Sequence, residues 1–450
     1  MTAGQFIRPA PDYPAAATDH WPRGLGPVAR GDYRGVMIIV IRHGNVLDPV
    51  AGEVIGERTV VIDGDRIVDV AESGPGPGVT ADLEIDAAGR FILPGFIDAH
   101  VHHTFPTMDF ARLVRMSMIE LSIGMAQCAE AILHRGFTTV RDTGGAIAGL
   151  VAAIGSGLTP GPHIVRAGRV ISQTGGHGDF RAGSAVEVPT CGCQIHADHH
   201  GNAHIADGPD ACRKAARFEL REGSDFLKIM SSGGVASPSD PFDAVQYTPE
   251  EISAITTEAD HRHTYVTAHA YTPEAITMAV DNGVRCIEHA NMIDAATAAR
   301  MAALGATMVP TLATYRAMED LGAKAGLPQA NLDKNKGVFA AGQRSIEIAR
   351  AAGVELGLGT DLLGEAQSRQ NSELAIRAEL EPAVDVLRSM YVTNARLCRL
   401  EGEIGVIKPG ARADIVISDV DPIANLAGLA EPEANLSAII AKGRPVRLRQ

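Results

Sequence analysis

Two histidines end an apolar stretch near residue 100, and they are the first candidates for metal chemistry. Residues 94–102 are Pro-Gly-Phe-Ile-Asp-Ala-His-Val-His, which places His100 and His102 at alternate positions of an apolar strand. Side chains alternate between the two faces of a strand, so both imidazoles point the same way. Two neutral imidazoles at this spacing can bind one divalent metal, and zinc suits them. The alternative is a pair of hydrogen-bonded histidines in a turn.

The same placement recurs further along the chain. His269, His289 and Asp361 each follow directly on a short apolar run. Taken singly, each would more often be a hydrogen-bonded polar residue or, for Asp361, a helix cap. Taken together with the first pair, they place four histidines and one carboxylate at strand ends.

Lys228 lies inside the apolar stretch Phe226–Met230 and is expected to be buried. A buried ammonium without a partner is costly, so something must compensate its charge. One answer is a salt bridge; the other is a deprotonated amine that takes up CO2 and becomes a carbamate, whose two oxygens can bridge two metals. The remaining donors then divide between two ions that share a water: His100, His102 and Asp361 on one, and His269 and His289 on the other.

The segments that must position these residues alternate short apolar strands with longer helical stretches, as in parallel βαβ units. Eight candidate strands are Gly95–His102, Thr138–Asp142, Ile164–Ala167, Phe226–Met230, Tyr265–Ala270, Cys286–His289, Thr307–Thr311 and Leu356–Asp361. Eight parallel strands would close into a barrel with its active site at their carboxyl ends. Residues 175–210 fit neither a helical nor a strand period and are expected to form a long functional loop.

Both ends of the chain carry short β-branched runs cut by turn residues, so they are expected to meet in a small β-sandwich. The predicted fold is therefore α/β: a (β/α)8 TIM barrel with a small β-sandwich domain built from both chain ends. The expected boundaries are 1–35 for an N-terminal arm, 36–94 and 400–450 for the sandwich, and 95–399 for the barrel.

Composition excludes several classes of protein. The 450 residues are 45% hydrophobic with a net charge of -14, and the acidic residues are scattered, which argues against nucleic-acid binding. Six irregularly spaced cysteines do not make a disulfide scaffold, so a reducing compartment, the cytoplasm, is expected. The sequence contains no secretion signal and no apolar run of about 20 residues, so no membrane role is expected.

The chain resembles the metal-dependent amidohydrolase superfamily from about Val36 to Ile440. Residues 173–179 (Gln-Thr-Gly-Gly-His-Gly-Asp) and 269–276 (His-Ala-Tyr-Thr-Pro-Glu-Ala-Ile) are similar to its imidazolonepropionase-related branch, which includes dipeptidases and ochratoxin-type amidases. The resemblance implies two divalent metals, zinc first, bridged by a carboxylated Lys228 and a hydroxide. The implied metal ligands are His100, His102, Lys228, His269, His289 and Asp361. It also implies a homo-oligomer.

The expected reaction is hydrolysis of an amide bond in a dipeptide or N-acyl amino acid, with a small molecule as the only partner. Asp361 is the candidate proton shuttle, which returns a proton to the leaving amine. Tyr271 is a candidate catalytic and substrate-binding donor to the oxyanion, against the alternative of a packing aromatic. His177 is a candidate substrate-binding residue, against the alternative of a solvated loop histidine.

Three alternatives stay open. The same two-metal site could open a cyclic amide, a lactone or a phosphotriester, and a chain that had lost its ligands could serve as a non-catalytic scaffold. The bound ion could be zinc, manganese or cobalt. A second group of thiols and imidazoles could hold a structural zinc, although an exposed lid is the preferred interpretation: Cys191, Cys193, His196, His199, His200 and His204.

Overall fold

A computed structural model describes residues 37–72, 74, 79–113, 115–180, 202–237, 240–324 and 327–449. Over these residues the chain has an α/β fold. The expected N-terminal arm lies outside the described residues. So does the second thiol and imidazole group, except for His204, whose Nδ1 lies 3.3 Å from Glu219 Oε1. No helix of the described part of the chain is long and apolar enough to cross a bilayer.

The two ends of the chain share one sheet. Its order is β17-β16-β15-β5-β1-β2-β3, with β4 beside β1, and β5 pairs antiparallel with β15 through Ile92 and Ile417. The hydrogen bonds form a single eight-stranded sheet, whose β-branched residues pack in a buried cluster of their own. The bounds are β1 Ile38–Asp48, β2 Glu53–Asp63, β3 Arg66–Ala71, β4 Leu83–Asp86, β5 Phe91–Pro94, β15 Ile415–Ser418, β16 Leu436–Ala441 and β17 Arg444–Leu448.

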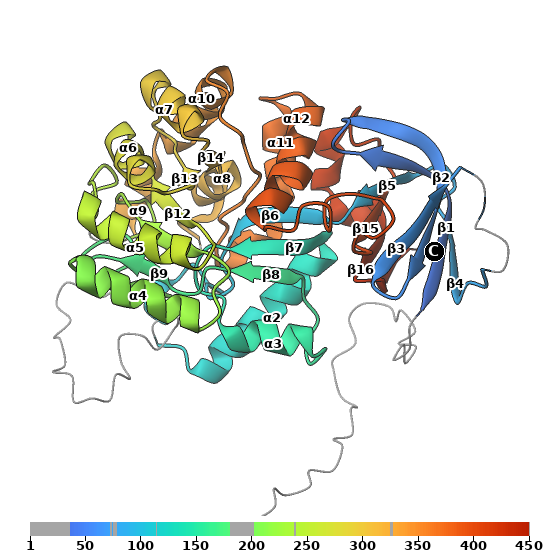
Figure 1. Ribbon diagram of the computed structural model, residues 1–450, viewed down its shortest axis with the longest axis horizontal. Helices are drawn as coiled ribbons and strands as arrows, with labels where there is room; N and C mark the ends of the chain where they lie inside the picture. The colour runs from blue at the N-terminus through green and yellow to red at the C-terminus, as the bar shows by residue number, and fades with distance from the viewer. Residues whose placement is uncertain are drawn as a thin grey trace, which may run out of the picture. The chain divides into compact units, whose positions relative to one another are not determined.

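Between these ends lie two sheets of parallel strands (Figure 1). The first has the order β6-β7-β8, with bounds Phe96–Val101, Phe137–Asp142 and His163–Arg166. The second has the order β10-β9-β11-β12-β13-β14, with bounds Ala203–Ile205, Val170–Ser172, Leu227–Met230, Val266–Ala270, Cys286–His289 and Thr307–Val309.

Seven of the eight expected strands are present to within three residues at either end. The expectation that 175–210 carries no regular structure is wrong, because β10 pairs with β9 and α4 begins at Pro209.

The eighth expected strand, Leu356–Asp361, is an irregular segment with one isolated bridge between Leu356 and Met308. Its backbone still bonds to both sheets: Gly357 N donates to Met308 O at 2.8 Å, and Ala99 N donates to Leu358 O at 2.9 Å. Gly359 explains the departure from a regular pleat. A Cβ atom there would lie 2.7 Å from the Cβ of His100, so only glycine allows the two segments to approach this closely.

Helices follow most of the parallel strands and pack against them. α4 packs on β9 and β11, and α5 on β12. Local sequence explains where several begin: Thr248 and Glu251 form a capping box at α5, and Thr272 caps α6 ahead of Pro273. The bounds are α1 Phe110–Leu113, α2 Met118–His134, α3 Ala148–Gly155, α4 Pro209–Arg221, α5 Pro249–His261, α6 Pro273–Asp281, α7 Ala295–Ala303, α8 Leu312–Leu321, α9 Gln329–Asn335, α10 Val338–Ala351, α11 Ser372–Ala378, α12 Ala383–Arg388, α13 Asn394–Leu397 and α14 Pro432–Asn435.

Asn394 links the irregular segment to β6 through hydrogen bonds, so we expect its replacement to lower stability. Its buried amide donates to Ile97 O at 2.7 Å and Leu358 O at 2.8 Å, and accepts from Leu358 N at 3.1 Å. Asn394→Ala leaves the buried Leu358 N–H without this acceptor, so we expect a loss of about 1–3 kcal/mol. Urea unfolding would measure it, with the exposed Gln329→Ala as control. Equal unfolding midpoints for the two variants would contradict this role.

Candidate active site

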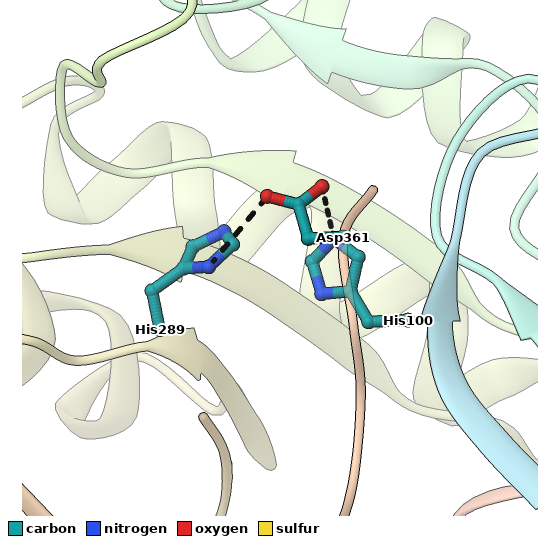
Figure 2. Close-up of side chains that lie close together, drawn as sticks. All are labelled: His100, His289 and Asp361. Atoms are coloured by element: carbon teal, nitrogen blue, oxygen red, sulfur yellow. Dashed lines mark ion pairs between the residues drawn. The ribbon is translucent and has the colours of Figure 1, made fainter. Parts of the chain in front are cut away.

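Three side chains from distant parts of the chain converge on one point (Figure 2). His100 lies on β6, His289 ends β13, and Asp361 ends the irregular segment. Asp361 Oδ1 lies 3.3 Å from His100 Nε2 and 3.0 Å from Nε2 of His102, which follows β6 directly. Within the described residues, His100, His289 and Asp361 form a group whose ligand atoms all lie within 4.8 Å of one another. Such a group can hold a metal ion.

Each of the four predicted imidazoles has one nitrogen within hydrogen-bond distance of an oxygen outside this point, and the one of His289, Nδ1, also lies 4.0 Å from Asp361 Oδ2. His102 Nδ1 donates to Gly144 O at 2.8 Å and His269 Nε2 to Gly233 O at 2.9 Å. His100 Nδ1 lies 2.7 Å from Glu288 Oε2, and His289 Nδ1 lies 2.7 Å from Thr311 Oγ1. Metal-binding histidines show this pattern, because an outer hydrogen bond orients the ring and leaves the second nitrogen to the ion.

The protonation states favour ligation as well. Burial lowers the pKa of His269 and of His289 well below 6.5, so both rings stay neutral and keep a lone pair. Burial acts in the opposite direction on Asp361, yet His100 and His102 hold its pKa well below the usual range. The site therefore presents two neutral imidazoles, His269 and His289, together with an ionised carboxylate, and Asp361 raises the pKa of His102 against the effect of burial. Nitrogen and carboxylate donors of this kind fit zinc.

Lys228 faces the same site from β11 and is 1% exposed. Within the described residues its amine has no hydrogen bond or ion pair, so the salt bridge, one of the two alternatives, is not formed there. Burial lowers its pKa, although Glu288 and Asp361 act to raise it. A lowered pKa favours the neutral amine, which is the form that reacts with CO2.

A cavity opens onto these side chains. Lys228 and Asp361 line it with His100, His102, His269 and His289, and its lining also includes apolar side chains: Phe105, Val170, Phe180, Met230, Met318 and Leu363. A concave, largely apolar site with a few convergent polar groups is typical of small-molecule sites. His177 also lines it, stacked on His269 with ring centroids 4.2 Å apart and with Nδ1 2.7 Å from Ser237 Oγ.

Tyr271 lies beside the site without lining the cavity. Its ring centroid is 4.7 Å from that of His269, but the residue is 3% exposed and its hydroxyl accepts from Tyr315 at 3.0 Å. The expectation that Tyr271 shares the side of His269 depended on a continuing strand, and β12 ends at Ala270. The oxyanion role of Tyr271 stays a prediction, which would require its hydroxyl to turn from Tyr315 toward the cavity.

Sequence reasoning missed Asp98, which ties the two ligand-bearing segments together. The fully buried carboxylate accepts from His100 N at 3.0 Å and Thr360 N at 3.2 Å, and from Thr360 Oγ1 at 2.7 Å and Gln370 Nε2 at 2.8 Å. The signal in the sequence was a charged residue inside an apolar strand. Such residues are rarely buried without partners, so Asp98 could have been expected to bind neighbouring groups. Glu288, next to His289, carried the same signal.

Comparisons with known proteins agree with this geometry. The model of the amidohydrolase family matches residues 91–446. Ochratoxinase from Aspergillus niger is 26% identical over 363 residues, covering 76% of this chain and 73% of the relative. A prolidase solved with N-methylphosphonate-L-proline is 41% identical with a TM-score of 0.86, covering 92% of this chain and all of the other. A Xaa-Pro dipeptidase solved with methionine in its active site is 28% identical with a TM-score of 0.81, covering 91% of this chain and 99% of the other.

Beneath the site, Glu373 supports the start of α8, which follows Thr311. Its Oε2 accepts from Ala313 N at 2.6 Å, and the side chain is fully buried. Burial raises the pKa of Glu373 to about 8, from 4.5. The folded protein therefore holds a proton on Glu373 over a pH range in which the unfolded chain has released it.

This difference predicts a pH-dependent stability. The contribution of protonated Glu373 is fully present below pH 4.5 and is lost as the pH rises to about 8. Glu373→Gln stays neutral, so we expect the variant to gain stability relative to the wild type between these limits. Urea unfolding at pH 5, 7 and 9 would measure the difference, with the exposed Glu379→Gln as matched control. A pH-independent difference would show that Glu373 does not titrate as described.

Proposed function

As a member of the amidohydrolase family, this chain is a hydrolase of amide or peptide bonds, and we propose that it cleaves dipeptides or N-acyl amino acids with a free carboxylate. One observation carries the proposal. Three imidazoles, those of His100, His102 and His289, lie within 4.0 Å of the Asp361 carboxylate. His269 and the buried Lys228, which has no partner among the described residues, line the same cavity. The prolidase and the Xaa-Pro dipeptidase, both similar over more than nine-tenths of this chain, support a dipeptide substrate.

The donor set fits two divalent ions. We propose that one is held by His100, His102 and Asp361, the other by His269 and His289, with carboxylated Lys228 shared between them. When bound, two such ions supply an activated water and polarise the carbonyl of the substrate. Zinc matches the nitrogen and oxygen donors, and manganese or cobalt would fit as well.

The protein's own groups supply the proton transfers and the orientation of the substrate. Among the described residues, Asp361 is the one carboxylate that lines the cavity, so it is the group placed to accept a proton and return it to the leaving amine. Hydrolysis of an amide requires this step, because an amide anion is a poor leaving group and a protonated amine is a good one. His177 lies on the cavity wall, where it is placed to bind the substrate carboxylate or carbonyl.

We also infer that the strands form one (β/α)8 barrel, as expected from the sequence, with the sheet from both chain ends as a separate β domain. Two observations support the closure. Residues 356–361 bond to β14 on one side and to β6 on the other, and β8 and β9, which lie in different sheets, are separated by three residues around Gly168. A cytoplasmic homo-oligomer remains the expectation from the sequence.

A metal assay combined with a substrate panel tests the function. We expect close to two equivalents of zinc, manganese or cobalt per chain, and hydrolysis of Xaa-Pro dipeptides, other dipeptides or ochratoxin-type N-acyl amino acids. Elemental analysis and amine release would measure them. Turnover confined to lactones, cyclic amides or phosphotriesters would replace the proposed substrate class, and a purified protein that binds no metal would overturn the proposal.

Replacement of Lys228 tests the bridging role. We expect Lys228→Ala to lose both bound metal and activity, because the variant lacks the carbamate that is proposed to be shared by the two ions. Short-chain carboxylic acids with bicarbonate should restore part of both, since a carboxylate can occupy the space of the carbamate. The exposed Lys336→Ala is the control. Full metal content and activity in Lys228→Ala would contradict the bridging role.

A further inference from the structure

His100 differs from the other three imidazoles in the acceptor that meets its outer nitrogen. His102, His269 and His289 face neutral groups, which are two backbone carbonyls and the Thr311 hydroxyl. His100 Nδ1 instead faces the Glu288 carboxylate at 2.7 Å. A carboxylate forms a charge-assisted hydrogen bond, which is stronger than a bond to a neutral acceptor.

Glu288 is held in place from several directions. Both His100 and Glu288 are 0% exposed, and the second carboxylate oxygen accepts from the Arg141 guanidinium and from the Thr267 hydroxyl. Glu288 precedes His289 on β13. This strand therefore contributes His289 to one proposed ion and Glu288, the hydrogen-bond partner of the ligand His100, to the other.

Arg141 supplies the positive charge that this buried carboxylate needs. The guanidinium is 0% exposed and also donates to Ala99 O at 2.6 Å and to the Tyr265 hydroxyl at 3.1 Å. Tyr265 in turn donates to Leu397 O at 2.7 Å. A chain of hydrogen bonds thus runs from Leu397 to His100, and none of its members lines the cavity except His100 itself.

We propose that Glu288, with its charge balanced by Arg141, is a positioning residue that fixes His100 with its proton on Nδ1. In this way Glu288 selectively strengthens the binding of the ion that His100, His102 and Asp361 hold. The inference rests on the proposed two-metal function. A carboxylate partner orients the ring and makes the inward nitrogen a better donor to a metal. The ion held by His269 and His289 lacks such a partner, so the two positions respond differently to the loss of Glu288.

Glu288→Gln tests the proposal, with Thr311→Val as the matched control. Glutamine keeps an acceptor for His100 Nδ1 and removes the charge. Valine removes the Thr311 hydroxyl, which contacts His289 Nδ1 and Tyr315 but neither His100 nor Glu288. We expect Glu288→Gln to bind one ion about 10- to 100-fold more weakly and the other with unchanged affinity. Chelator competition would give the two affinities, and anomalous scattering from zinc-soaked crystals would show which position empties. The control should weaken the ion at His269 and His289 instead.

Two further measurements keep the test decisive if Glu288→Gln, which leaves Arg141 without its partner, fails to fold. The double variant Arg141→Met with Glu288→Gln removes both buried charges and should show the same selective weakening. In the zinc-loaded wild type, nitrogen-15 NMR of labelled histidines should show the proton of His100 on Nδ1.

The outcomes separate this inference from the proposed function. Unchanged affinities at both positions in the folded variants, or a His100 proton on Nε2, would overturn the inference while the two-metal function stands. A wild type that binds no metal would overturn the proposed function itself.

Discussion

The site depends on how ionisable groups are kept inside an apolar interior. Asp98, Arg141, Lys228 and Glu288 are all 0–1% exposed, and burying any one of them alone would be costly. Asp98 is satisfied by backbone and side-chain donors, and Arg141 and Glu288 satisfy each other. Only Lys228 lacks a partner among the described residues, so the interior contains one uncompensated amine at the place where a carbamate would lie.

This constraint also explains the irregular segment that carries Asp361. The segment passes so close to β6 that a Cβ at Gly359 would lie 2.7 Å from the Cβ of His100. The segment uses glycines, the Asp98 carboxylate and the Asn394 amide to reach β6. Asp361 then ends the segment with a φ of 52°, a left-handed conformation that aspartate tolerates better than most residues, and its carboxylate meets the histidines.

The same polar contacts distinguish the two halves of the proposed metal centre. His100 and His102 are fixed by the backbone of β6, by Asp98 and by the carboxylate of Glu288, whereas His269 and His289 depend on a loop carbonyl and on a hydroxyl at the start of α8. α8 in turn rests on Glu373, a buried carboxyl of raised pKa. Both halves therefore use a loop carbonyl, that of Gly144 for His102 and that of Gly233 for His269, but only His100 has an ionised outer partner.

The sequence by itself determined the α/β class, seven of the parallel strands and the six candidate ligands, because strand ends and imidazole spacing are local properties of the chain. It could not show that residues 356–361 are irregular, that β10 pairs at the edge of its sheet, or that Tyr271 turns toward Tyr315. Nor could it identify Asp98, Arg141 and Glu288 as the supports of the ligands. Those features depend on contacts between residues up to 272 positions apart, such as Asp98 and Gln370, and only the folded chain brings such residues together.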